Sequence, residues 1–165
     1  MKKLLSLFAA TGLVATTSAT VVACGDKVET LTWADDKKIE DFVKEASLDT
    51  NADGKLDLDF KTPEMPKIDG VTIKGSIKGQ IIDSLDKEKG GLGTYFKETK
   101  ELVSNEETSY VLTAEGNKDD KTVTIYVIKI VGKDVKYEDA VPTSGKITYS
   151  TLNKIKLDLP QPKAE

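Results

Sequence analysis

The chain has 165 residues, of which 28 are acidic and 24 basic, so its formal net charge is −4. It contains neither histidine nor arginine. Without histidine it lacks the commonest general base of enzymes and the commonest zinc ligand in proteins. Without arginine it has no bidentate phosphate clamp, and its negative net charge disfavours binding to nucleic acid. The composition therefore argues against an enzyme and against a nucleic-acid-binding protein.

The first 23 residues have the three zones of a secretory signal peptide. Lys2 and Lys3 precede an uncharged apolar run of 11 residues over 4–14, and a polar stretch then leads to Cys24, the only cysteine. The apolar run is well short of the roughly 20 residues that a membrane-spanning helix needs. The alternatives are an ordinary signal peptide followed by an incidental cysteine, or an uncleaved membrane helix. A lone exported thiol would be a liability, and acylation would explain both its position and its isolation.

Val21-Val22-Ala23, directly before this cysteine, resembles the lipobox of bacterial lipoproteins. In that family a diacylglyceryl group is attached to the cysteine sulfur and the signal peptide is cut just before it. The resemblance implies a mature chain of 142 residues that begins at Cys24, with a net charge of −6 once Lys2 and Lys3 are removed. It also implies a location at the outer face of the cell membrane, where two acyl chains give stable anchoring to membrane lipid.

Residues 24–33 are predicted to form a short lipidated tether with a strand at its end. The next unit, 34–75, should contain a helix, a turn and short strands. The helix is predicted over 34–48, because its apolar residues recur at the spacing of one helical face. Those residues are Ile39, Phe42, Val43 and Ala46.

Turn-forming residues dominate 49–54, and two short strands are predicted after them. Residues 55–60 alternate between polar and apolar side chains, as a half-buried strand would. Residues 71–74 are the second candidate, and Pro63 and Pro66 interrupt regular structure between the two.

The C-terminal unit, 76–162, is predicted to combine one helix with an antiparallel sheet, followed by a tail at 163–165. The helix should cover 76–89 and pack on the sheet through Ile77, Ile81 and Leu85. Segments rich in β-branched and aromatic residues predict the strands. These are 109–115, 122–131 and 146–159, with a loop over 116–120 and a turn over 142–145.

These elements predict an α+β fold. A small antiparallel sheet of three or more strands in the C-terminal half would be covered by one or two helices. The strand over 122–131 should be central, because it is apolar on both faces.

Two regions of the chain resemble a known family. The leader, residues 1–27, is similar to those of surface lipoproteins from mollicutes, the wall-less bacteria. The segment SGKITYSTLNKIKLDLPQPKAE, which follows the strand KTVTIYVIKI, resembles the end of the spiralin family. The resemblance implies a spiralin-like helix-plus-strands unit over 76–162 and lipidation at Cys24. It also implies a non-enzymatic coat or host-surface-binding role, with a host surface protein or glycan as partner.

Residues 49–57 match the first nine positions of an EF-hand calcium loop. In such a loop, side-chain oxygens at positions 1, 3, 5 and 9 and the backbone carbonyl at position 7 bind the ion, and glycine at position 6 allows a sharp turn. The matching ligands are Asp49, Asn51, Asp53 and Asp57, with the carbonyl of Lys55 at the seventh position and Gly54 at the sixth.

Two residues depart from the EF-hand pattern. Phe60 stands at the twelfth position, where a bidentate glutamate belongs, and Pro63 opposes an exit helix. The pattern therefore predicts either weak Ca²⁺ binding in the millimolar range or a solvated turn built from residues that tolerate turn geometry. The alternative function is accordingly a calcium- or solute-binding accessory lipoprotein.

Overall fold

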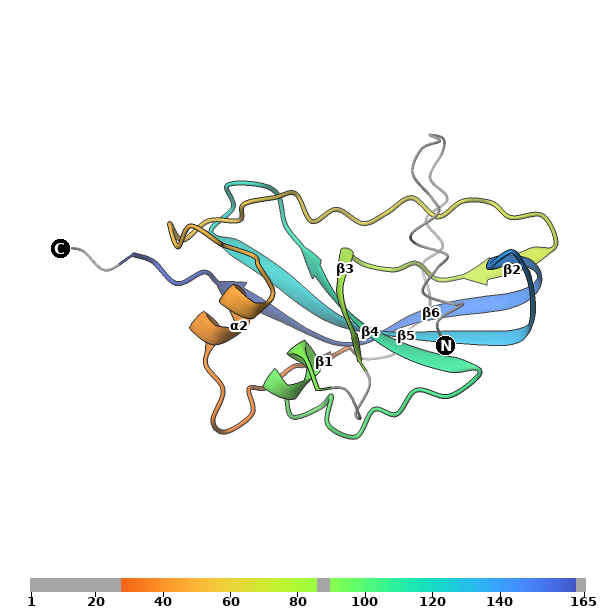
Figure 1. The fold of residues 1–165 in the computed structure, drawn as a ribbon, viewed down its shortest axis with the longest axis horizontal. Coiled ribbons are helices and arrows are strands. Elements are labelled where there is room, and N and C mark those ends of the chain that lie inside the picture. The colour runs from red at the N-terminus through yellow and green to blue at the C-terminus, as the bar shows by residue number, and fades with distance from the viewer. Residues whose placement is uncertain (1–27, 86–89, 163–165) are drawn as a thin grey trace.

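The computed structural model describes residues 28–85 and 90–162, and a six-stranded mixed sheet forms its centre (Figure 1). The strand order is β1-β6-β5-β4-β3, and β2 shares one edge of β6 with β1. β1 and β2 run parallel to β6, whereas the other pairings are antiparallel. The strands are β1 (Glu29–Thr30), β2 (Val71–Lys74), β3 (Gln80–Leu85), β4 (Thr108–Glu115), β5 (Thr122–Glu138) and β6 (Val141–Asp158).

The predicted α+β fold, with helices covering a small sheet, is wrong. The described residues contain a single α-helix, α2 (Ile39–Glu45), and one 3₁₀ helix, η1 (Leu92–Tyr95). The helix predicted over 34–48 is thus reduced to two turns. The three C-terminal strands and their antiparallel pairing are confirmed, as are the central position of β5 and the short strand β2.

The helix predicted over 76–89 is also wrong, because residues 80–85 form β3 and pair with β4. Gly79 adopts a positive φ of 68°, and a Cβ atom there would lie 2.2 Å from the carbonyl oxygen of Ala114. A register shift after Ile81 then turns the strand, so that Ile77 and Leu85 are buried on opposite faces of the sheet. Residues 86–89 lie outside the described part of the chain.

Two further local predictions are wrong. Residues 55–60 form no strand, although Leu56 and Phe60 are buried; Phe60 makes only an isolated bridge with Gly116. The turn expected over 142–145 lies inside β6, because the chain reverses three residues earlier, at Asp139 and Ala140. Both have positive φ angles, of 47° and 67°.

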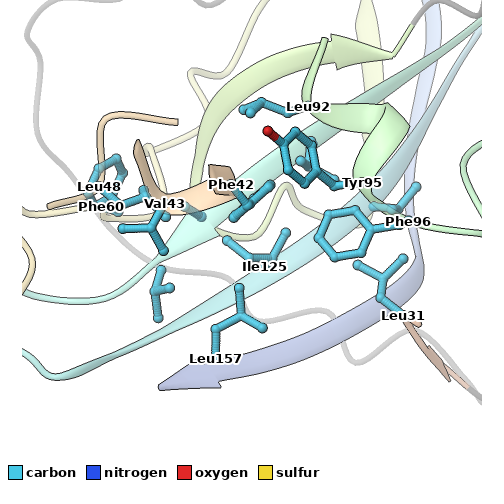
Figure 2. Packing of buried hydrophobic residues seen from close by; sticks show 14 of the residues in the cluster. Leu31, Phe42, Val43, Leu48, Phe60, Leu92, Tyr95, Phe96, Ile125 and Leu157 are labelled. Atoms are coloured by element: carbon cyan, nitrogen blue, oxygen red, sulfur yellow. The ribbon is translucent and has the colours of Figure 1, made fainter. Parts of the chain in front are cut away.

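One face of the sheet carries the larger hydrophobic cluster, called here the first core. This core lies at the end of the sheet that holds Val123 of β5 and Leu157 of β6. Helix α2, η1 and the segment after β1 cover this end (Figure 2). Phe42 of α2 lies at its centre, with ring centroids 5.4 Å from Tyr95 and 5.3 Å from Phe96 in edge-on geometry. Trp33 packs on Phe42 and Phe96 and lies, partly buried, against this core.

The second core lies on the opposite face, toward the hairpin end of β5 and β6. Alternation along β5 explains the division, because Ile125 and Val127 face the first core while Ile128 and Ile130 face the second. No helix of the described residues covers this face; β2 and the extended chain around it do so. The fully buried members are Ile77, Val111, Ile128, Ile130, Ile147 and Tyr149.

Candidate functional site

The first half of the predicted calcium loop forms a hydrogen-bonded turn directly after the helical segment. Asp49 is 7% exposed, and its two carboxylate oxygens accept the backbone N–H groups of Asp53 at 3.1 Å and Gly54 at 2.8 Å. The side-chain oxygen of Asn51 accepts the same N–H of Asp53 at 3.2 Å. Gly54, with a φ of 79°, allows the chain to close around these acceptors. The structure thus brings the side chains of Asp49 and Asn51 together at the backbone of Asp53.

The second half of the loop is held by other contacts. The N–H of Lys55 donates to Asp53 Oδ1 at 3.0 Å. Asp57 Oδ2 accepts the hydroxyl of Thr50 at 2.5 Å and its N–H at 2.6 Å, and these bonds hold the pKa of Asp57 below its usual value. Asp57 is therefore engaged with Thr50, while Asp49 and Asn51 accept the N–H of Asp53 and the carboxylate of Asp53 accepts that of Lys55.

The residues after the loop have structural partners of their own. Asp59 accepts the N–H of Lys118 at 2.8 Å and pairs with Lys61 at 2.9 Å, and Phe60 is buried. Within residues 28–85 and 90–162, no group of three or more histidine, cysteine or acidic side chains is arranged to hold a metal ion. Calcium binding at this loop stays a prediction.

A contact that the sequence did not indicate fixes the loop to the end of the chain. Gln161 Nε2 donates to the carbonyl of Gly54 at 3.1 Å and to that of Leu159 at 3.0 Å. A Cβ atom on Gly54 would lie 2.5 Å from Gln161 Nε2. The two residues are 107 positions apart, so no local pattern could have found this contact.

A hollow of about 370 Å³ lies beside η1, between the end of β3 and the segment that follows η1. Its lining includes Leu85, Gly93, Thr99 and Lys100. The hydroxyl of Thr99 donates to the carbonyls of Phe96, at 2.9 Å, and Gly93, so local structure already uses it.

Four lysines lie close together on one face of the sheet, a cluster that no local sequence pattern predicted. Lys129 and Lys133 lie on the same face of β5, opposite the face that carries the second core. Lys133 is directly opposite Lys146 of β6. Lys146 in turn pairs with Thr72 of β2, which places Lys74 on the same face. We call this set the lysine face (Lys74, Lys129, Lys133 and Lys146). Its signal in the sequence is the spacing of Lys129 and Lys133 within an apolar strand.

Cys24, the predicted lipidation site, lies outside the described residues. No helix within the described part of the chain is both long and apolar enough to cross a membrane. Comparisons with protein-family models, curated protein sequences and solved structures found no match to this chain.

Proposed function

We propose that this chain is a lipid-anchored surface protein, held at the outer face of the cell membrane by acylated Cys24, with a non-enzymatic coat or host-surface-binding role. The observation that carries the proposal is the single cysteine placed directly after Val21-Val22-Ala23, behind an apolar run too short to span a bilayer. The spiralin-like segments at both ends of the chain point to the same class of protein.

The start of the folded domain supports this proposal. β1 begins at Glu29, and Leu31, seven residues after Cys24, is only 1% exposed in the first core. The order of the elements therefore leaves room for an anchor, a very short spacer and then a packed domain, as the predicted tether requires.

The proposal is tested by replacing Cys24→Ser and following both processing and phase partitioning. The wild-type protein should enter the detergent phase, with an intact mass that shows acyl chains on an N-terminal cysteine. The Cys24→Ser variant should be soluble or unprocessed. A double variant, Cys24→Ser with Ser76→Cys, keeps one thiol at an exposed position and should behave like Cys24→Ser. A wild-type mature protein with an unmodified thiol would contradict the proposal.

The host-surface role is tested by pull-down from host surface extracts with the acylated protein and the Cys24→Ser form. Retention of the same host glycoprotein by both forms would support binding by the domain itself. Retention by neither form would leave only the coat role.

A second candidate function is that of a calcium-binding accessory lipoprotein. The convergence of Asp49 and Asn51 on one backbone N–H favours it, because their oxygens already point into one turn. Calcium would have to compete with backbone donors for these oxygens, which agrees with the weak affinity expected without a bidentate glutamate.

A further inference from the structure

We propose that the lysine face docks onto the anionic lipid headgroups of the membrane in which Cys24 is anchored, so that the domain lies with this side against the bilayer. The inference rests on the proposed lipid anchor. It adds which side of the domain meets the membrane and which lipid chemistry that side recognises.

The lysines of the lysine face repel one another. Lys133 and Lys146 stand directly opposite each other on neighbouring strands, an arrangement in which like charges destabilise a sheet. Lys74, Lys133 and Lys146 are exposed, Lys129 is half-buried, and none of the four pairs with an acid among the described residues. A surface of negative charge would remove this repulsion.

The rest of the domain leaves this side uncovered. Helix α2 and η1 cover the other end of the same face, as Figure 1 shows by the separation of α2 from β2. At the lysine end, the covering chain around β2 lies on the opposite face, over the second core. Of the acids in this part of the hairpin, Asp134 directly follows Lys133 and is exposed, whereas Glu138 and Asp139 lie at the turn.

The charge of the whole molecule favours one orientation. Residues 34–59, which include α2 and the Asp49–Asp57 loop, hold nine acids and four lysines. An anionic membrane repels this end and attracts the lysine face, because each lysine near such a surface contributes a favourable interaction that decays within a Debye length.

The short spacer brings the domain within that distance. Four peptide steps join Cys24 to Val28, so the acylated residue lies at most about 14 Å from the start of the described chain. β1 pairs with the same edge of β6 as β2 does. Lys146 is seven residues from Asn153, the partner of Glu29, or about 23 Å along the strand. A spacer this short keeps the domain next to the headgroups, with the lysine face within reach.

The test reconstitutes the acylated mature protein into two kinds of vesicle, pure phosphatidylcholine and phosphatidylcholine with roughly a third phosphatidylglycerol. An amine-reactive acetylating reagent then labels exposed lysines, and mass spectrometry reads each site. In anionic vesicles, labelling of Lys74, Lys133 and Lys146 should fall about fivefold and recover in high salt. Lys154 and Lys156, exposed on the opposite face, should label equally in both vesicles.

A charge-reversal variant provides the second measurement. Lys133→Glu with Lys146→Glu should abolish the difference between the vesicles, read at Lys74, while Lys154→Glu with Lys156→Glu should preserve it. Flotation with vesicles reports the anchor separately, so a protein that fails to float contradicts the proposed function. A protein that floats but labels equally in both vesicles, or is protected only by added host extract, overturns the docking proposal.

Discussion

The two ends of the β5–β6 hairpin bury opposite faces of one sheet, and different secondary-structure elements cover the buried face at each end. At the end that holds Val123 and Leu157, a helix and an aromatic cluster cover one face. At the hairpin end, a short parallel strand and extended chain cover the other face. A long alternating strand can therefore be buried without a helix, by extended chain alone. The comparison also shows how a strand that is apolar on both faces supplies two separate cores.

Each end leaves its second face to solvent, and lysines occupy both of these faces. Lys129, Lys133 and Lys146 lie behind the second core, and Lys154 and Lys156 lie behind the first. Only the first group stands beside β2 and gains a fourth lysine, Lys74. Both exposed faces therefore carry positive charge, but the lysine face carries more of it.

The largest expected effect is the loss of a central side chain from either core. Phe42→Ala should lower the free energy of unfolding by about 3–5 kcal/mol and Ile147→Ala by about 2–5 kcal/mol, because each leaves a cavity around a fully buried position. Since β5 contributes to both cores, urea unfolding of either variant should remain one transition. Two separate transitions would show that the halves are independent units.

The second prediction concerns the contribution of the Asp49 side chain to the stability of the loop beside the first core. Asp49→Ala should cost about 1–3 kcal/mol, because the N–H of Gly54 loses its acceptor and the N–H of Asp53 keeps only Asn51. If the calcium proposal holds, millimolar calcium should raise the melting temperature of the wild type, and magnesium should do so less. The response should vanish in Asp49→Ala and persist in Asp59→Ala. A melting temperature indifferent to calcium would leave the loop as a turn alone.

Tyr137 tests the packing at the hairpin end. Its hydroxyl is buried and has no hydrogen-bond partner among the described residues, so Tyr137→Phe should stabilise the protein by about 1 kcal/mol. Tyr126→Phe is the matched control, because the hydroxyl of Tyr126 donates to Glu115 at 2.6 Å. The control should lower the midpoint of urea unfolding, and a loss of stability in both variants would contradict this account of Tyr137.

The smallest effect concerns alkaline pH. Burial, and then the hydrogen bond to Glu45, raise the pKa of Tyr95 from 10.0 to about 12. The neutral phenol is thus favoured in the folded state. Its contribution to stability is complete below pH 10 and is lost as the pH rises toward 12. Tyr95→Phe should therefore show a shallower fall of the urea midpoint over this range, whereas a slope equal to that of the wild type would exclude this role.

Regular local patterns were predictable from the sequence. The alternation in β4, β5 and β6 gave the strands and their antiparallel order, and Phe42 and Val43 were correctly assigned to a buried helical face. The spacing of Ile77, Ile81 and Leu85 gave a wrong prediction of a helix, because a spacing of four residues fits both a helix and one side of a strand. Pairing with β4, the positive φ of Gly79 and the bulge after Ile81 decided in favour of the strand.

Local sequence was enough to predict an anchor at Cys24, an acidic turn over 49–57 and three alternating strands, because each depends on neighbours along the chain. Three features came only from the folded structure: which face each end of the hairpin buries, the contact of Gln161 with Gly54, and the position of Lys74 on the same face as Lys146. These depend on strand register and on contacts between distant segments, and a shift of one residue in register would move every side chain to the other face.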